Sequence, residues 1–137
     1  MSDVPIVGGA RRRRLPQRRP SVTESIEFMR GDGSAMRYEA TISFDELCRP
    51  KEIFLFGAKE GTDMAAVLAD TAVALSVALQ HGVLAEAMAV SISRVAELGD
   101  QARGRPTSII GAALDLLARY EREMTAVAAA PAKRGGR

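Results

Sequence analysis

The chain has 137 residues, of which 47% are hydrophobic and 26% charged, a composition that predicts one globular domain. Six arginines and one acid give residues 1–20 a charge of +5, three cations give residues 131–137 a charge of +3, and 10 basic and 16 acidic side chains leave residues 21–130 at −6. A single cysteine, Cys48, excludes an intrachain disulfide and a zinc site built from thiolates alone.

The ends of the chain have the composition of disordered tails. Residues 1–20 combine Gly-Gly, prolines and like charges, and residues 131–137 are again rich in Gly and basic side chains, so we expect a domain over 21–130 between two basic tails. The arginines at 11–14 precede LPQ and not an apolar segment, which is unlike a signal peptide. The apolar stretch 64–79 is expected to be too short and too weakly apolar for a membrane span, so we expect a soluble cytoplasmic protein.

Three strands are predicted first along the chain. SVTESIEFM (21–29) and MRYEATISF (36–44) alternate apolar and polar side chains, and RGDGSA between them is typical of a turn. EIFLF (52–56) is continuously apolar, which favours a central strand or one covered on both faces. Short connections predict an antiparallel sheet.

Three helices are predicted after the strands. The first begins at Thr62 or Asp63 as N-cap and ends with His81 in its last turn and Gly82 just beyond; its alanine-rich sides predict a buried helix. A second helix is expected over about 84–98, followed by the polar loop GDQARGRP. Thr107 or Ser108 caps a third helix. The fold class is therefore α+β: a three-stranded antiparallel sheet packed by about three helices, with disordered basic N- and C-terminal tails.

The corner GAKEGTD (57–63) joins a strand to a helix N-terminus, as many phosphate-binding loops do. It lacks the Walker A and dinucleotide-binding spacings, and its two acids, Glu60 and Asp63, would repel a phosphate. We expect a structural corner in which Asp63 complements the helix dipole. The alternative is an anion or nucleotide site, in a nucleotide-binding domain or an enzyme; its residues would be Gly57, Lys59, Gly61, Thr62, Arg103 and Arg105.

Other polar residues carry weaker signals. His81 has no metal-ligand cluster around it in the sequence and is expected to contact carbonyls at the helix end, so no metal is predicted. Asp70, within the first helix, is expected to be structural, as a cap or as the partner of an arginine of the 103–105 loop. No catalytic residue is predicted.

The segment ARRRRLPQRRP is the clearest functional feature of the sequence. Its arginines, Arg11, Arg12, Arg13, Arg14, Arg18 and Arg19, are suited to the phosphates of a nucleic acid, with up to about six contacts and a steep salt dependence. Without interleaved aromatics it offers no base stacking, so such binding would be mostly non-specific. A solvated tail that only aids solubility is the other interpretation.

Several passages resemble the TSCPD domain, which occurs at the C-terminal end of cobalamin-dependent ribonucleotide reductases and as short stand-alone proteins. They are RRRLPQRRP, RPKEIFLFGAKEGTD, DTAVALSVALQHGV and RGRPTSIIGAALDLLARY, which together span roughly 11–121. Where the family has Cys-Pro-Asp after Thr-Ser, this chain has Ile109, Ile110 and Gly111 after Thr107 and Ser108, so any role of that cysteine is absent.

The resemblance implies an accessory or regulatory module in deoxyribonucleotide metabolism, with a ribonucleotide reductase subunit as partner. Adenosylcobalamin would belong to that reductase, and no cofactor is expected in this chain. Ribonucleotide reduction needs a radical cysteine and a reducing cysteine pair, so a chain with one cysteine is not expected to catalyse it alone. Alanine-rich helix surfaces also indicate a homodimer. A nucleic-acid-binding protein using the arginine segment is the alternative function.

Overall fold

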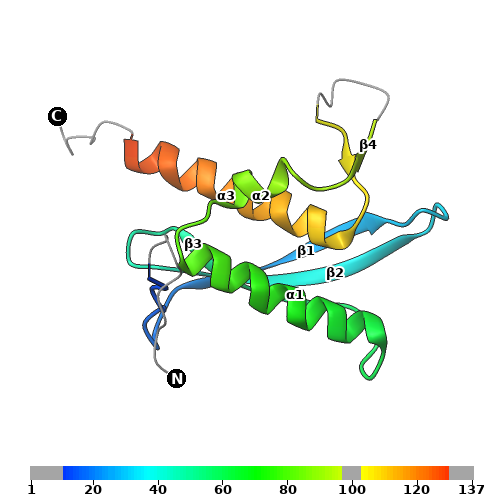
Figure 1. The fold of residues 1–137 in the computed structure, drawn as a ribbon, viewed down its shortest axis with the longest axis horizontal. Helices are drawn as coiled ribbons and strands as arrows, with labels where there is room; N and C mark the ends of the chain where they lie inside the picture. Colours follow the sequence, from blue (N-terminus) through cyan, green and yellow to red (C-terminus); the bar gives the residue numbers. More distant parts are fainter. Residues whose placement is uncertain (1–10, 97–102, 130–137) are drawn as a thin grey trace, which may run out of the picture.

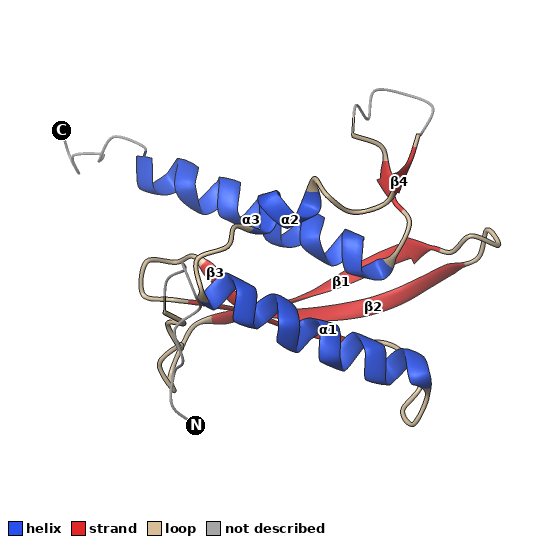
Figure 2. Cartoon of the chain, in the orientation of Figure 1, coloured by secondary structure: helices blue, strands red, loops and turns tan. Residues whose placement is uncertain are grey.

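The computed structural model describes residues 11–96 and 103–129 of the chain (Figure 1). A three-stranded antiparallel sheet has the order β1-β2-β3, and three helices and a two-stranded ribbon follow it (Figure 2). In chain order the elements are β1 (Ser21–Met29), β2 (Ala35–Phe44), β3 (Pro50–Phe56), α1 (Asp63–Gln80), α2 (Ala85–Ala89), β4 (Arg94–Val95), β5 (Arg105–Pro106) and α3 (Ile109–Ala129). The predicted α+β class and antiparallel sheet are confirmed.

The core lies between one face of the sheet and the helices. The alternating apolar residues of β2 point to this face, and Ala40 and Ile42 are fully buried there. Ala40 pairs with Leu55 and Ile42 with Ile53 across the β2–β3 ladder, so the same face continues into β3. Helices α1 and α3 supply the opposite side of the core with Leu68, Leu75, Leu79, Leu114 and Leu117. The result is a two-layer domain whose other sheet face carries mainly polar side chains.

Strand β3 differs from the sequence prediction, which was wrong about its place. It is an edge strand, bonded to β2 alone among the described strands, and its burial alternates. Phe54 and Phe56 lie on the open face and are exposed, whereas Ile53 and Leu55 are buried. The continuous apolar run therefore belongs to a half-buried edge strand, because two of its apolar side chains, both aromatic, face solvent.

Helix α1 was predicted incorrectly in one respect, because the sequence predicts a buried helix. By length and composition it is apolar enough to cross a membrane, a test that the core helix of a soluble protein also passes. In this fold it packs along β3, yet only 33% of that stretch is buried. Met64 and Val67, which a buried helix would enclose, are exposed.

The second helix ends much earlier in the structure than the sequence predicted. Helix α2 ends at Ala89, and residues 94–95 pair with 105–106 as the ribbon β4–β5; the end of the predicted helix, 97–98, lies outside the described residues. Arg94 explains the change of direction. Its guanidinium bonds both carboxylate oxygens of Asp115 on α3, at 2.6 and 3.0 Å, and the carbonyls of Ala89 and Gly104.

Candidate anion-binding site

The arginine segment is packed onto the domain over residues 11–20, whereas the sequence predicted disorder throughout 1–20. The Arg13 N–H donates to the carbonyl of Gln80 at 2.7 Å, and the Phe44 N–H donates to the Pro20 carbonyl at 3.0 Å. Arg19 donates twice to one carboxylate oxygen of Glu52, at 2.9 and 3.0 Å. These bonds fasten the segment between the end of α1 and the turn that joins β2 to β3; residues 1–10 lie outside the described part.

The end of α1 is built by the two residues that the sequence singled out. Gly82 has a φ of 94°, the conformation that a glycine adopts most easily. The Gly82 N–H donates to Leu79 and the Val83 N–H to Ala78, both at 3.0 Å, which is the Schellman arrangement. His81 is the C-cap, and its Nδ1 contacts the Val77 carbonyl at 2.9 Å. The predicted helix stop is confirmed.

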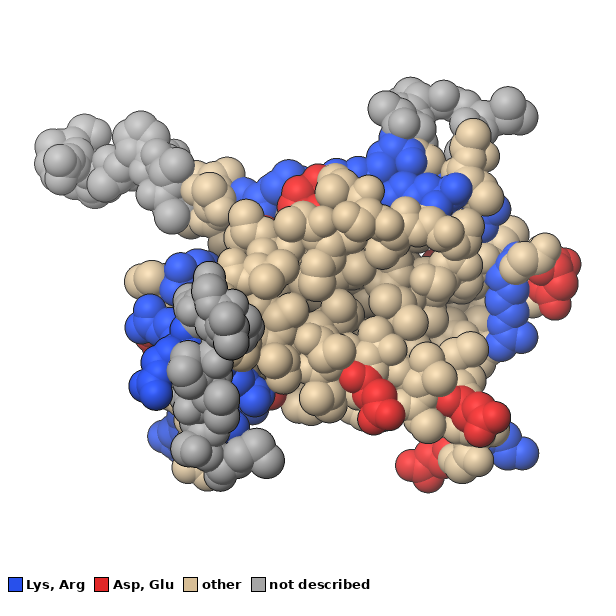
Figure 3. Space-filling model, viewed as in Figure 1, with Lys and Arg blue, Asp and Glu red and all other residues tan. Residues whose placement is uncertain are grey.

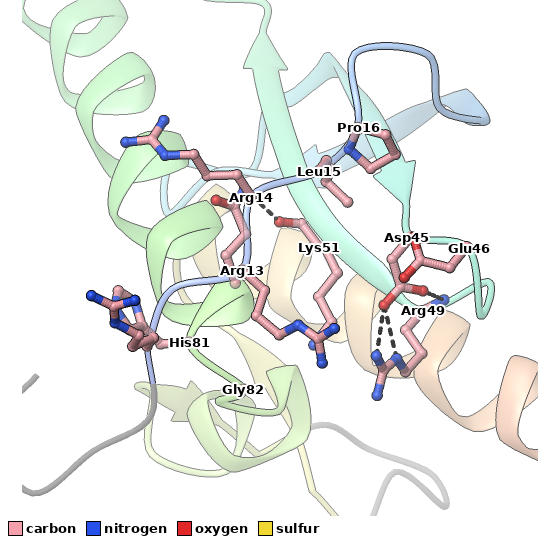
Figure 4. Close-up of a pocket in the computed structure, with 12 residues that line it drawn as sticks. Arg13, Arg14, Leu15, Pro16, Asp45, Glu46, Arg49, Lys51, His81 and Gly82 are labelled. Atoms are coloured by element: carbon pink, nitrogen blue, oxygen red, sulfur yellow. Dashed lines mark hydrogen bonds and ion pairs between the residues drawn. The ribbon is translucent and has the colours of Figure 1, made fainter. Parts of the chain in front are cut away.

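Beside this helix end lies a pocket of about 260 Å³ that is rich in cationic side chains (Figure 4). Arg13 and Lys51 extend toward the end of α1. The Lys51 ammonium donates to the Leu79 carbonyl at 3.0 Å, where the helix dipole is negative. Five cationic side chains line the pocket against two carboxylates: Arg11, Arg13, Arg14, Arg49 and Lys51, with Asp45 and Glu46.

One of the two carboxylates, that of Asp45, already accepts hydrogen bonds within the turn between β2 and β3. Asp45 accepts from the backbone N–H groups of Leu47 and Arg49, both at 2.9 Å, and from the Arg49 guanidinium at 2.9 Å. Burial by itself raises the pKa of Asp45, but these bonds outweigh it and hold the pKa below the ordinary value of 3.8. Asp45 is therefore ionised at neutral pH, and it organises the turn at the edge of the pocket.

The pKa of Lys51 indicates a position where an anion would be stabilised. Partial burial lowers its pKa below the ordinary 10.5, and the nearby charge of Arg49 lowers it further. An anion in the pocket would oppose both effects, since a nearby negative charge favours the protonated ammonium group. The Nε2 atom of His81, which also lines the pocket, is buried without a hydrogen-bond partner among the described residues.

The glycine corner lies at the other end of α1, about 27 Å away for a helix of this length. A Cβ at Gly57 would meet Tyr38 Cδ2 at 2.7 Å, so this glycine permits close packing. The Thr62 hydroxyl is the N-cap: it accepts from the Ala65 N–H at 3.2 Å and donates to the Lys59 carbonyl at 2.6 Å. Asp63 occupies the first turn, as predicted.

The other members of the predicted nucleotide site have their own partners. Arg103 pairs with Glu86 and approaches Asp115 at 3.6 Å, and Arg105 donates to the Met29 carbonyl at 3.4 Å. These contacts tie the β4–β5 ribbon to α2, α3 and the end of β1, so they assign both arginines to the scaffold. They favour the structural interpretation of the glycine corner.

Two further predicted structural residues have different outcomes. Ser108 is confirmed as the cap of α3, because its hydroxyl accepts from the Gly111 N–H at 3.1 Å, while the Thr107 N–H bonds the Ser93 carbonyl at 3.1 Å. Asp70 lies on the exposed side of α1, and the expected ion pair with Arg103 is replaced by the pairing of Arg103 with Glu86.

The arginines of the segment differ in their positions and bonding partners. Arg11, Arg13 and Arg14 line the pocket, and Arg18 is exposed on the same segment. Arg12 bonds the Gln80 side chain at 2.7 Å, and Arg19 pairs with Glu52. The pocket's other basic members, Arg49 and Lys51, were not predicted from the sequence. The one available signal was a pair of cations around Pro50, close to the strand start.

No protein-family model, curated protein or solved structure matches this chain. Within the described residues, no group of three or more His, Cys, Asp or Glu side chains is arranged to hold a metal ion.

Proposed function

We propose that this protein is a non-catalytic binding module whose cationic pocket takes phosphate groups of a nucleic acid. The observation that carries the proposal is the excess of five cationic side chains over two carboxylates around one pocket, with Lys51 partly desolvated among them. Phosphate contacts of this kind supply most of the affinity of sequence-independent nucleic-acid binding.

The form of the segment favours a chain of phosphates over one compact ligand. Residues 11–16 are neither helix nor strand, and the basic series continues to Arg18 beyond the pocket. Successive cations along an extended segment suit successive phosphates along a backbone. No aromatic residue occurs between 11 and 20, so base stacking does not contribute and we expect little sequence preference.

The test is fluorescence anisotropy with a labelled single-stranded oligonucleotide, using the full chain over a range of salt concentrations. With about four phosphates neutralised, the logarithm of the association constant should fall with log salt at a slope near −3. The double variant Arg13→Gln/Arg14→Gln should lower the slope by about 1.4. The matched control is Arg37→Gln/Arg122→Gln, which removes two exposed arginines elsewhere and should leave the slope unchanged.

Two outcomes would contradict the proposal. Binding with no salt dependence, or equal losses in both double variants, would show that the pocket is not the phosphate site. Competition by inorganic triphosphate or ATP at concentrations far below those of the oligonucleotide's own phosphates would assign the pocket to a free nucleotide instead.

The TSCPD resemblance supports a second candidate, an accessory role with a ribonucleotide reductase. The resembling passages fall on β3 and its glycine corner, on α1, and on β5 with α3, which are packed together in one domain. The test is co-migration of the full chain with a purified cobalamin-dependent reductase in size-exclusion chromatography at moderate salt. A shared peak is expected, and separate peaks at micromolar concentrations of both proteins would contradict the role.

A further inference from the structure

The two outer strands of the sheet differ in how their edges are covered. The order β1-β2-β3 makes β1 and β3 the outer strands, and β1, with nine residues, is the longer of the two (Figure 2). Helix α1 covers the outer edge of β3: Ser76 bonds the N–H and the carbonyl of Ile53, and Gln80 donates to the Lys51 carbonyl at 3.1 Å. No side chain of the described residues bonds the backbone of residues 21–27 of β1 in this way.

The pairing of β1 with β2 shows which backbone groups are left over. In an antiparallel ladder, residues whose N–H and carbonyl bond the neighbouring strand alternate with residues whose groups point away from it. Here the bonds fall on even-numbered residues. The Phe44 N–H donates to the Pro20 carbonyl at 3.0 Å at one end, the Arg30 N–H donates to the Ser34 carbonyl at 2.7 Å at the other, and the register between them is continuous. The backbone groups of the odd-numbered residues of β1 therefore point away from the sheet.

These outward groups are accessible. Thr23, Ser25 and Glu27 are exposed, and no hydrogen bond to their backbone is present within the described residues. A groove of about 330 Å³ lies between this edge and α3. Ser25 borders the groove although its side chain belongs to the other face of the sheet, so the groove reaches the backbone of the edge. An edge strand with free backbone groups is a template for a further strand.

We propose that β1 pairs with β1 of a second copy of this chain, antiparallel across a two-fold axis at Ser25. The two sheets then join into one sheet of the order β3-β2-β1-β1-β2-β3. The pairing closes at two copies, because Ser76 and Gln80 cover the other edge of each sheet. The inference does not depend on the proposed nucleic-acid function. It places the contact on β1 and not on the alanine-rich helix surfaces considered from the sequence.

The side chains of β1 suit pairing with their own copy in this register. On the polar face, Ser25 lies opposite the partner's Ser25, and Thr23 lies opposite the partner's Glu27. On the face toward the helices, Val22 lies opposite the partner's Phe28. Val22 is 37% exposed in the single chain, so the pairing gives it an apolar neighbour. The whole strand takes part, because residue 21 lies opposite residue 29 of the copy.

The charges beside the edge also allow the pairing. No like charges are directly opposed, and the two copies of Glu24 are diagonal neighbours across the axis. Each Glu24 carboxylate accepts from its own Arg119 at 3.2 Å. Arg119 and Arg122 line the groove that receives the strand, and basic side chains gather along this α3 side of the molecule (Figure 3). The other carboxylate of the groove, that of Asp115, is held by Arg94. The acidic side chains of the incoming strand therefore meet arginines.

The test is the mass of the full chain by light scattering and sedimentation velocity, in the absence of nucleic acid. Wild type should approach twice the 14.6 kDa chain mass as its concentration rises. A nine-residue strand is about 30 Å long and only one strand wide, so the contact is smaller than a standard interface. We therefore expect a dimer of micromolar affinity.

A proline in the outer edge tests the backbone pairing. Ser25→Pro removes an N–H that faces away from β2, so the bonds between β1 and β2 stay and the fold should be kept, which circular dichroism checks. At the axis each copy loses the bond that this N–H donates, and we expect the dimer to weaken about thirtyfold or more. Ser25→Ala is the matched control: it keeps the N–H and should dimerise within about threefold of wild type.

A cysteine at the axis tests the register without relying on the proline variant. Directly opposed residues that bond each other's backbone have Cα atoms about 5.5 Å apart, a separation that a disulfide bridges. In a Cys48→Ser background, Ser25→Cys should therefore give a disulfide-linked dimer on oxidation. Glu27→Cys is the control and should stay uncrosslinked, because residue 27 lies opposite residue 23 of the copy, with its Cα more than about 7 Å from that of its own copy.

Several results would overturn the proposal. A wild-type chain that stays monomeric up to about 100 μM would do so, since a dimer of about 10 μM affinity would be largely assembled there. Equal dimerisation of Ser25→Pro and Ser25→Ala would place the interface elsewhere. A disulfide in Glu27→Cys that forms as fast as that in Ser25→Cys would reject the register. Growth beyond two copies would contradict the closed two-fold pairing.

Discussion

The hydroxyl of Ser76 holds the open edge of the sheet, and its removal has an effect that can be worked out from the contacts. Ser76 lies on α1 and is 7% exposed. Its Oγ accepts from the Ile53 N–H at 2.9 Å and donates to the Ile53 carbonyl at 3.2 Å, both on the side of β3 that faces away from β2. In Ser76→Ala both backbone groups lose their partner.

Each unsatisfied buried backbone group costs about 1–3 kcal/mol. A groove of about 310 Å³ borders Ser76, so water can reach the edge and reduce that cost. Alanine is also the better helix former by about half a kilocalorie per mole. We expect Ser76→Ala to lower the free energy of unfolding by about 2 kcal/mol.

Urea unfolding followed by circular dichroism measures this loss. At a slope of about 2 kcal/mol per molar urea, the midpoint should fall by about 1 M. The control is Ser91→Ala, because the Ser91 hydroxyl is exposed and makes only a 3.4 Å contact with the Ala87 carbonyl. That variant should stay within about 0.5 kcal/mol of wild type. A Ser76→Ala protein as stable as Ser91→Ala would refute the account of the sheet edge.

Two further predictions concern Gly57, which follows β3, and Asp45, in the turn between β2 and β3. Gly57→Ala should lower the free energy of unfolding by about 2 kcal/mol or more, because its φ is +138° and the new Cβ would meet Tyr38 Cδ2 at 2.7 Å. The control Gly61→Ala, with φ at +82° and open space around the Cβ, should lower it by about 1 kcal/mol. Equal losses in thermal unfolding would contradict the packing role of Gly57. Asp45→Asn should cost about 1–2 kcal/mol at pH 7. Because folding lowers the pKa of Asp45, the stability that its carboxylate contributes is complete above the ordinary pKa of 3.8 and is lost as pH falls through the lower folded value. The unfolding curves of wild type and Asp45→Asn should therefore converge in acid. A constant difference in stability down to about pH 2 would contradict the charge-based explanation.

The candidate site shows how far sequence patterns reach. The arginine segment was recognisable as the feature suited to phosphates, because six like charges within nine residues need no tertiary structure to be noticed. Its attachment was not predictable: the Arg13 N–H bonds Gln80, 67 residues later in the chain, and composition alone favoured disorder. Arg49 and Lys51 joined the site through the turn at Asp45, whose bonds depend on the folded geometry.

The sequence by itself determined the elements whose signals are local. Alternation in 21–29 and 36–44 marked two strands, and Thr62 and Gly82 marked the ends of α1, because caps and side-chain periods act within a few residues. Only the tertiary structure decided which apolar residues are buried. It left Phe54, Phe56, Met64 and Val73 exposed, because burial depends on which neighbour covers a surface, and it placed β3 at the edge and folded the arginine segment over the end of α1.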